Sequence, residues 1–354
     1  PMPVNMDCFA RLCLPAPTFW ETKEAMERYL YGTLDGLYDG ALMKNMGEAV
    51  AVLIKKLREE KRIRIIGDYD IDGVNASYIL LTGLLRCGAL VDVDIPDRIR
   101  DGYGLNEHLI ELAAEAEVDT IITCDNGIAA VQEIAQAKAL GMTVIVTDHH
   151  EPQEVLPPAD ALINPKQPDC PYPYKSLCGA AVAFKLIQCL YEAYGISAEE
   201  WDPLLENVAF ATVGDVMDLT GENRILVKEG LKRLNHTRNE GFRALIAANG
   251  LTEGPISAYH IGFVLGPCIN ATGRLDTAKR ALKLLIASTP EQAKILAEEL
   301  KSLNDERKDM TQQGVAEAME LMESTSMKED KVLVIYLPTC HESLAGIIAG
   351  RIRE

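Results

Sequence analysis

The chain has 354 residues, of which 48% are hydrophobic and 25% are charged. This composition is ordinary for a globular protein, leaves room for one large domain or two, and argues against intrinsic disorder. The formal net charge of -18 disfavours non-specific adsorption to nucleic acid, because affinity for phosphate backbones comes largely from Lys and Arg. A nucleic-acid substrate is not excluded, since carboxylates loaded with metal ions are locally far less negative.

Cysteine usage and hydropathy indicate where the protein resides. The nine cysteines form no CxxC pair and no regular framework, which favours a reducing compartment and buried thiols. The N-terminal stretch PMPVNMDCFARLCLPAP is interrupted by Asp7, Arg11 and prolines before an apolar signal core develops. No later run approaches the length of a membrane span. We therefore expect a cytoplasmic protein.

The first half of the chain alternates between strand and helix patterns. Residues 1–45 are irregular and are expected to be an N-terminal extension packed on a main domain at 46–287. Alternation of this kind is typical of an α/β fold, with a parallel sheet, right-handed crossovers and helices on both faces. The expected strands lie at 62–67, 91–96, 120–124 and 143–147, and the expected helices at 47–61, 73–86, 106–116 and 128–140.

The second half is mainly helical. The proline-rich stretch NPKQPDCPYPYKSL predicts a loop along the sheet edge. Thr289 as N-cap, Pro290 at the first helical position and Gln292 predict the start of a long connector helix over 288–325. After it, KVLVIYLP predicts a strand and ESLAGIIAGRIRE a helix, which we interpret as the beginning of a second α/β domain at 326–354. One strand and one helix cannot bury a core of their own, so this interpretation implies a truncated domain.

Three predicted strands end on acidic residues or histidine, in the runs RIRIIGDYDIDG, TIITCDNG and TVIVTDHHE. In an open α/β sheet the carboxyl ends of neighbouring strands share one crevice, where these side chains would meet. So many carboxylates repel one another unless divalent cations neutralise them. The candidate side chains are Asp68, Asp70, Asp72, Asp125, Asp148, His149 and His150.

The donor types indicate which metal the crevice would take. Carboxylate oxygens with a few imidazoles suit Mn²⁺ or Mg²⁺ better than zinc. Two such ions that share a carboxylate form a clamp for phosphoryl transfer, and Asp125, which follows a central motif strand, is well placed to bridge them. Any one aspartate at a strand end is more often a turn former or helix cap than a ligand. Three such motifs together reverse that expectation.

The motifs GDYDIDG, CDNG and TDHHE resemble those of the DHH phosphoesterase superfamily. Other stretches are similar to its RecJ-type branch of single-strand-specific exonucleases: IPDRIRDGYGL, LINPKQPDCPYPYKSLCGAAVAFKL, GDVMDLTGENR, GPCINATGRL and HESLAGIIAGRI. The resemblance implies a DHH catalytic domain followed by a DHHA1-like domain. It also implies 5′–3′ hydrolysis of single-stranded DNA to 5′-mononucleotides with two Mn²⁺ or Mg²⁺ ions, in DNA repair or recombination. Single-stranded DNA is the expected partner, together with a single-strand-binding protein or a helicase.

The resemblance also assigns roles to individual residues. It implies metal ligation by Asp70, Asp72, Asp125, His149 and Asp215, with Asp68 as a further or supporting ligand. The implied catalytic group comprises Asp125, Asp148, His149 and His150, in which Asp148 orients a neighbouring histidine. Arg98, Asn270 and Arg274 are implied to grip substrate phosphates. Asp215 lies in a helical stretch, and periodicity alone does not single it out.

Departures from the family pattern leave two alternatives open. A glycine-rich motif with a histidine and an oligonucleotide-binding barrel are not found in the sequence, while Cys268 and Asn126 replace more usual residues. One alternative is a DHH phosphodiesterase for short oligonucleotides, cyclic dinucleotides or pyrophosphate, against which GENR and GPCINATGRL argue. The other is a truncated, non-catalytic paralogue, against which the full set of predicted ligands argues.

Overall fold

The centre of the protein is a sheet of five parallel strands in the order β2-β1-β3-β4-β5. The computed structural model describes residues 23–99, 101–325 and 330–353. The central strands are apolar and β-branched because helices cover both faces of the sheet; all five residues of β3 are buried. The strands are β1 (Arg62–Ile66), β2 (Leu90–Asp94), β3 (Thr120–Cys124), β4 (Thr143–Thr147) and β5 (Ala161–Ile163).

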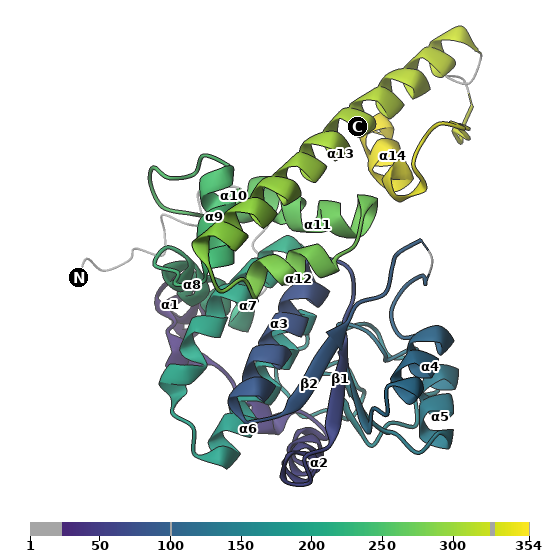
Figure 1. Ribbon diagram of the computed structural model, residues 1–354. Coiled ribbons are helices and arrows are strands. Elements are labelled where there is room, and N and C mark those ends of the chain that lie inside the picture. Colours follow the sequence, from purple (N-terminus) through teal and green to yellow (C-terminus); the bar gives the residue numbers. More distant parts are fainter. Residues whose placement is uncertain (1–22, 100, 326–329, 354) are drawn as a thin grey trace.

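Helices cover both faces of the sheet (Figure 1), and alternate residues of β1, β3 and β4 belong to two different cores. Ile63, Ile122 and Ile145 point to one face, where they join residues of α2 (Met46–Arg58), α3 (Ile71–Arg86) and α6 (Gly179–Tyr194). Ile121 and Val144 point to the other face, toward α4 (Glu107–Glu115) and α5 (Val131–Ala139). The order of strands changes direction between β1 and β3, and open α/β sheets bind their ligands at such a switch point.

A third core lies beside the sheet and is built from helices. Phe210, Phe242 and Ile269 belong to it, together with Ala293 and Leu300 of the long helix α13. Thr289 caps α13, since its side-chain oxygen accepts a hydrogen bond from the Gln292 amide at 3.2 Å. The helices of this half are α7 (Leu205–Gly214), α8 (Gly221–Leu234), α9 (Glu240–Ala248), α10 (Ala258–His260), α11 (Gly266–Leu275), α12 (Lys279–Leu285) and α13 (Pro290–Ser324); a π-helical segment (Ile261–Leu265) joins α10 to α11.

The predicted parallel α/β fold and the predicted long helix are confirmed, with boundaries that differ by a few residues. The edge strand β5 was not expected, because three apolar residues before a proline-rich loop carry no periodicity. Of the predicted N-terminal extension, residues 1–22 lie outside the described residues, and α1 (Lys23–Tyr31) begins the part that is described. Among the described helices, none combines the length and apolar character needed to cross a membrane.

The predicted strand at 331–338 is wrong. A β-strand needs a hydrogen-bonded neighbour, and no described segment pairs with these residues. Val332, Val334 and Tyr336 are therefore exposed. The helix predicted after this segment does form as α14 (Ala345–Arg353), and Ile348 packs against Gly314 of α13. The assignment of 326–354 to a second domain stays a prediction.

Candidate metal centre

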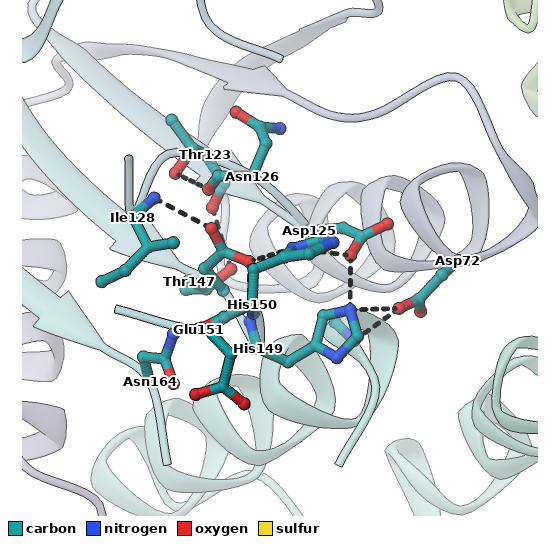
Figure 2. Close-up of polar contacts among 12 residues, drawn as sticks. Asp72, Thr123, Asp125, Asn126, Ile128, Thr147, His149, His150, Glu151 and Asn164 are labelled. Atoms are coloured by element: carbon teal, nitrogen blue, oxygen red, sulfur yellow. Dashed lines mark hydrogen bonds and ion pairs between the residues drawn. The ribbon is translucent and has the colours of Figure 1, made fainter. Parts of the chain in front are cut away.

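Acidic and imidazole side chains converge at the switch point of the sheet. The loop after β1 supplies Asp68 and Asp70, and the first turn of α3 supplies Asp72. Asp125 follows β3, His149 and His150 follow β4, and Asp215 caps the end of α7. His149 Nε2 lies 3.0 Å from an oxygen of Asp125, 3.6 Å from Asp72 and 3.8 Å from Asp215. Figure 2 shows the His149 ring between Asp125 and Asp72. Four segments that are distant in the sequence thus meet within ligand distance of one another.

The donor atoms form three overlapping groups, each with its atoms within 4.8 Å of one another. Asp125 belongs to two of the groups and His149 also belongs to two, so the groups share donors. This sharing is what a pair of ions with a bridging ligand requires. The groups are Asp125–His149–His150, Asp72–His149–Asp215 and Asp68–Asp70–Asp125, and every predicted metal ligand falls in at least one of them.

Backbone amides fix the second and third aspartates of the GDYDIDG motif. Asp70 is the N-cap of α3, because its carboxylate accepts from the amides of Asp72 at 2.8 Å and Gly73 at 3.0 Å. The Asp72 carboxylate accepts from the amides of Gly179 at 2.6 Å and Ala180 at 2.7 Å, at the start of α6. For Asp70, the role of helix cap and that of candidate ligand therefore coexist.

The backbone at Asp125 is held in an unusual conformation. Its φ of 61° lies in the left-handed region, which costs a non-glycine residue free energy and persists only where the surroundings impose it. The Tyr103 hydroxyl donates to the Asp125 carbonyl oxygen at 3.0 Å. On the other side, a methyl group on Gly179 would lie 2.7 Å from the Asp125 Cβ, so only glycine permits this approach of α6. Sequence reasoning missed Tyr103, although it lies in the quoted DGYGL stretch.

Asp148 organises the two histidines rather than joining a ligand group. Its carboxylate accepts from the amides of His149 at 2.7 Å and Ile128 at 2.9 Å, and it contacts His150 Nδ1 at 2.8 Å. Burial favours the neutral acid, but hydrogen bonds from His150 and the amides outweigh burial and lower the pKa of Asp148. The same contact raises the pKa of His150. Asp148 thus holds the exposed His150 ring in place and favours its protonated form.

The electrostatics of the cluster call for cations. Burial and the neighbouring carboxylates raise the pKa of Asp68 to about 8 and that of Asp215 to about 7. The same causes raise the pKa values of Asp70 and Asp125, whereas burial lowers that of His149. Among the described residues, Asp68 Oδ1 and Asp125 Oδ1 are buried without a hydrogen bond, although the second lies 3.0 Å from His149 Nε2. Divalent cations would neutralise this charge and be coordinated by these oxygens, so the set of ligand atoms fits Mn²⁺ or Mg²⁺.

The predicted phosphate-binding residues lie beside the loop after β1. The Arg98 guanidinium is 5.1 Å from the centre of the Tyr69 ring, and Arg274 Nη1 donates to the Ser343 carbonyl at 2.8 Å. Asp276 pairs with Arg280, so it does not neutralise Arg274. Asn270 anchors α11 to the motif loop, because its side-chain oxygen accepts from the Ile71 amide at 2.8 Å. Its predicted contact with substrate stays a prediction.

A parallel sheet that carries an Asp-His-His run and two further acidic motifs at its switch point is the arrangement of a DHH phosphoesterase domain. The chain belongs to the DHH family, and residues 62–212 match the N-terminal domain of that family.

Within this family the chain is similar to proteins named RecJ. It is 38% identical over 333 residues to the single-stranded-DNA-specific exonuclease RecJ of Bacillus subtilis, covering 94% of this chain and 42% of the relative. It spans about half the length of the curated relatives it matches. A crystal structure of exonuclease RecJ bound to manganese superposes with a TM-score of 0.79 at 36% identity, covering 88% of this chain and 77% of that one. The Mn²⁺ complex of RecJ from Thermus thermophilus gives 0.77 at 35% identity, with coverage of 88% and 44%.

Proposed function

We propose that this chain carries the catalytic centre of a metal-dependent exonuclease that degrades single-stranded DNA from the 5′ end to 5′-mononucleotides, in DNA repair or recombination. The observation that carries the proposal is the convergence of Asp70, Asp72 and Asp125 with His149 and Asp215 at the switch point. The names of the relatives and the manganese in their structures support it.

The proposal assigns a place to each charged side chain of the crevice. Asp70, Asp72, Asp125, His149 and Asp215 would hold two Mn²⁺ or Mg²⁺ ions, with Asp125 between them and Asp68 in support. Such ions, when bound, lower the pKa of a water and stabilise the charge that develops on the phosphate.

His150 would serve the phosphate rather than the metal. Asp148 engages His150 Nδ1 and raises the pKa of the ring, so the protonated ring would offer its Nε2 hydrogen to a phosphate oxygen in place of the Tyr103 hydroxyl. Tyr103 would hold the His150 ring in a fixed position relative to the Asp125 backbone, since its hydroxyl is 3.3 Å from His150 Nε2 and 3.0 Å from the Asp125 carbonyl oxygen.

Arg98 and Arg274 would orient the strand. Both lie beside Tyr69, which separates Asp68 from Asp70, and a guanidinium pairs bidentately with phosphate oxygens. A side chain on Gly273 would collide with the Tyr69 carbonyl oxygen, so α11 packs directly on the motif loop. This packing would place the arginine that follows within reach of a phosphate at the metal centre.

The proposal extends to location and partners. A cytoplasmic location is supported by the seven described cysteines, all of which are free thiols. An enzyme restricted to single strands depends on other proteins to open a duplex, so a helicase or a single-strand-binding protein is the expected kind of partner.

Hydrolysis assays on matched substrates test the proposal. With Mn²⁺, we expect the 354-residue chain to release mononucleotides from the 5′ end of single-stranded DNA, to leave duplex DNA largely intact and to lose activity with a chelator. Cyclic dinucleotides and pyrophosphate are the competing substrates. Faster turnover of these small substrates would overturn the exonuclease assignment, and inactivity on all of them would favour a non-catalytic role.

A further inference from the structure

A group of arginines next to the metal centre has no acidic partner. In a chain with 53 acidic residues, Arg64, Arg233 and Arg280 are each paired with carboxylates. Among the described arginines that form no ion pair with an acid, four interact with one another through their charges or lie on the same helices: Arg98, Arg274, Arg307 and Arg351. We call these four side chains the arginine recess.

Hydrogen bonds to neutral groups hold the arginine recess together. Arg274 of α11 donates to the Ser343 carbonyl at 2.8 Å, and the Ser343 hydroxyl donates to the Arg274 carbonyl at 3.0 Å, which ties α11 to the segment before α14. Arg307 of α13 donates through Nε to the Asn304 side-chain oxygen at 3.1 Å. Asn304 in turn contacts Cys268 of α11 at 3.6 Å. Arg307 is therefore positioned against the helix that carries Arg274.

The positive charges are close enough to perturb one another. Burial, then the proximity of Arg98 and Arg307, lowers the pKa of Arg274. Burial, then the proximity of Arg351, lowers the pKa of Arg307. Gathering like charges without a counter-anion costs free energy, and three of the four, all but the exposed Arg351, are half-buried. Such an arrangement suits an anion supplied from outside, and the guanidinium forks match phosphate oxygens.

We propose that Arg307, flanked by Arg351 of α14, binds a phosphate of the substrate strand beyond the one held by Arg98 and Arg274, and so favours strands longer than a dinucleotide. This inference rests on the proposed function and adds chain-length selection to it. A 5′-phosphorylated dinucleotide has one phosphate for the metal centre and one for Arg98 and Arg274. A phosphate at Arg307, on the helix that contacts α11 through Asn304, would be a further one and therefore requires a longer strand.

Length selection and salt dependence test this role. We would measure kcat/KM with Mn²⁺ on a 5′-phosphorylated oligothymidylate of about 20 nucleotides and on the 5′-phosphorylated dinucleotide, and binding of the long strand as a function of KCl concentration. In Arg307→Gln, the ratio of kcat/KM for the long strand to that for the dinucleotide should fall about tenfold. The dependence of log affinity on log salt should lose about one unit of slope.

Three further variants separate binding from folding. Arg307→Lys should restore the salt slope but only part of the affinity, because an ammonium lacks the bidentate fork. Arg351 is exposed, so its substitution leaves the core intact. Arg351→Gln should lower the ratio of kcat/KM for the long strand to that for the dinucleotide, but by less than Arg307→Gln does. Arg280→Gln is the control of matched charge, since Arg280 is paired with Asp276 and Glu299, and it should change neither quantity.

The outcomes distinguish this inference from the proposed function. Equal losses on both substrates, or an unchanged salt slope in Arg307→Gln and Arg351→Gln, would overturn the phosphate subsite while the exonuclease assignment stands. A wild-type chain that binds the long strand without cleaving it would contradict the proposed function. In that case the salt dependence of binding in the arginine variants would still show whether Arg307 contacts a phosphate. A wild-type chain that neither binds nor cleaves single-stranded DNA would overturn both.

Discussion

Two clusters of uncompensated charge flank Tyr69, and they are built in different ways. On one side, the carboxylates of Asp70 and Asp72 are fixed by backbone amides at the ends of buried elements. On the other side, Arg274 and Arg307 are each held by one hydrogen bond to a neutral oxygen. The acidic cluster is therefore rigid before any ligand binds, whereas the arginine recess depends on how α11, α13 and α14 pack. The proposed hydrolysis would take place at the edge of the sheet, whereas the proposed selection of the DNA strand would depend on the packing of these helices.

The largest effect is expected from removing Asp125, the carboxylate that two of the ligand groups share. In Asp125→Ala we expect the rate on single-stranded DNA to fall by on the order of 10³-fold or more, because the side chain would serve both ions. Elemental analysis should show less Mn²⁺ per chain. Asp309→Ala, at an exposed position on α13, is the control. An unchanged rate and Mn²⁺ content in Asp125→Ala would show that the site is misplaced.

Removing an arginine should separate strand binding from metal binding. We expect Arg274→Ala to weaken binding of single-stranded DNA by about 10–100-fold and to flatten its salt dependence, since a charge-assisted contact to phosphate is lost. Manganese content should stay at the wild-type level. The surface variant Arg280→Ala removes the same charge and should bind the strand normally. Loss of bound manganese in Arg274→Ala would contradict the division into two clusters.

A smaller effect is expected from crowding the acidic cluster. In Gly179→Ala the new methyl group meets the Asp125 Cβ at 2.7 Å, so Asp125 must leave its present position, in which its carboxylate lies 3.0 Å from His149 Nε2. We expect Mn²⁺ affinity, measured by titration calorimetry, to fall about tenfold. Gly47→Ala in α2 has open space around the added methyl group and should leave the affinity unchanged. Equal affinities in the two variants would show that the cluster is less rigid than the packing indicates.

Glu206 is a buried carboxylate outside both clusters, and its substitution is expected to have the smallest effect on catalysis. Burial raises its pKa from an ordinary 4.5 to about 7. The folded state therefore holds this proton more tightly than the unfolded chain, and its contribution to stability is lost as pH rises from about 4.5 through about 7. Glu206→Gln should be stabilised relative to wild type by on the order of 1–3 kcal/mol more at pH 8 than at pH 5, as measured by urea denaturation. The same difference at both pH values would contradict the raised pKa.

Much of the sheet and of the acidic cluster is predictable from the sequence. The strands β1, β3 and β4 are short β-branched runs, and helical spacing in the intervening segments identifies the crossovers, because both patterns reflect local burial. The acidic motifs follow these strands directly. Once a parallel sheet is assigned, their convergence at one edge is expected. The strand predicted at 331–338 shows the limit of the same reasoning, since an apolar β-branched run forms a strand only where a partner strand lies beside it.

By itself, the sequence determined which residues end the strands, which family motifs they form and that divalent cations are needed. Tertiary structure alone decided the contacts between segments far apart in the chain. These are the amides of α6 on Asp72, the Tyr103 hydroxyl on the Asp125 backbone, the approach of Asp215 to His149 and the arginine recess. The physical reason is that local periodicity reports which face of an element is buried. Which distant side chains meet there depends on strand order and helix packing, which no single segment encodes.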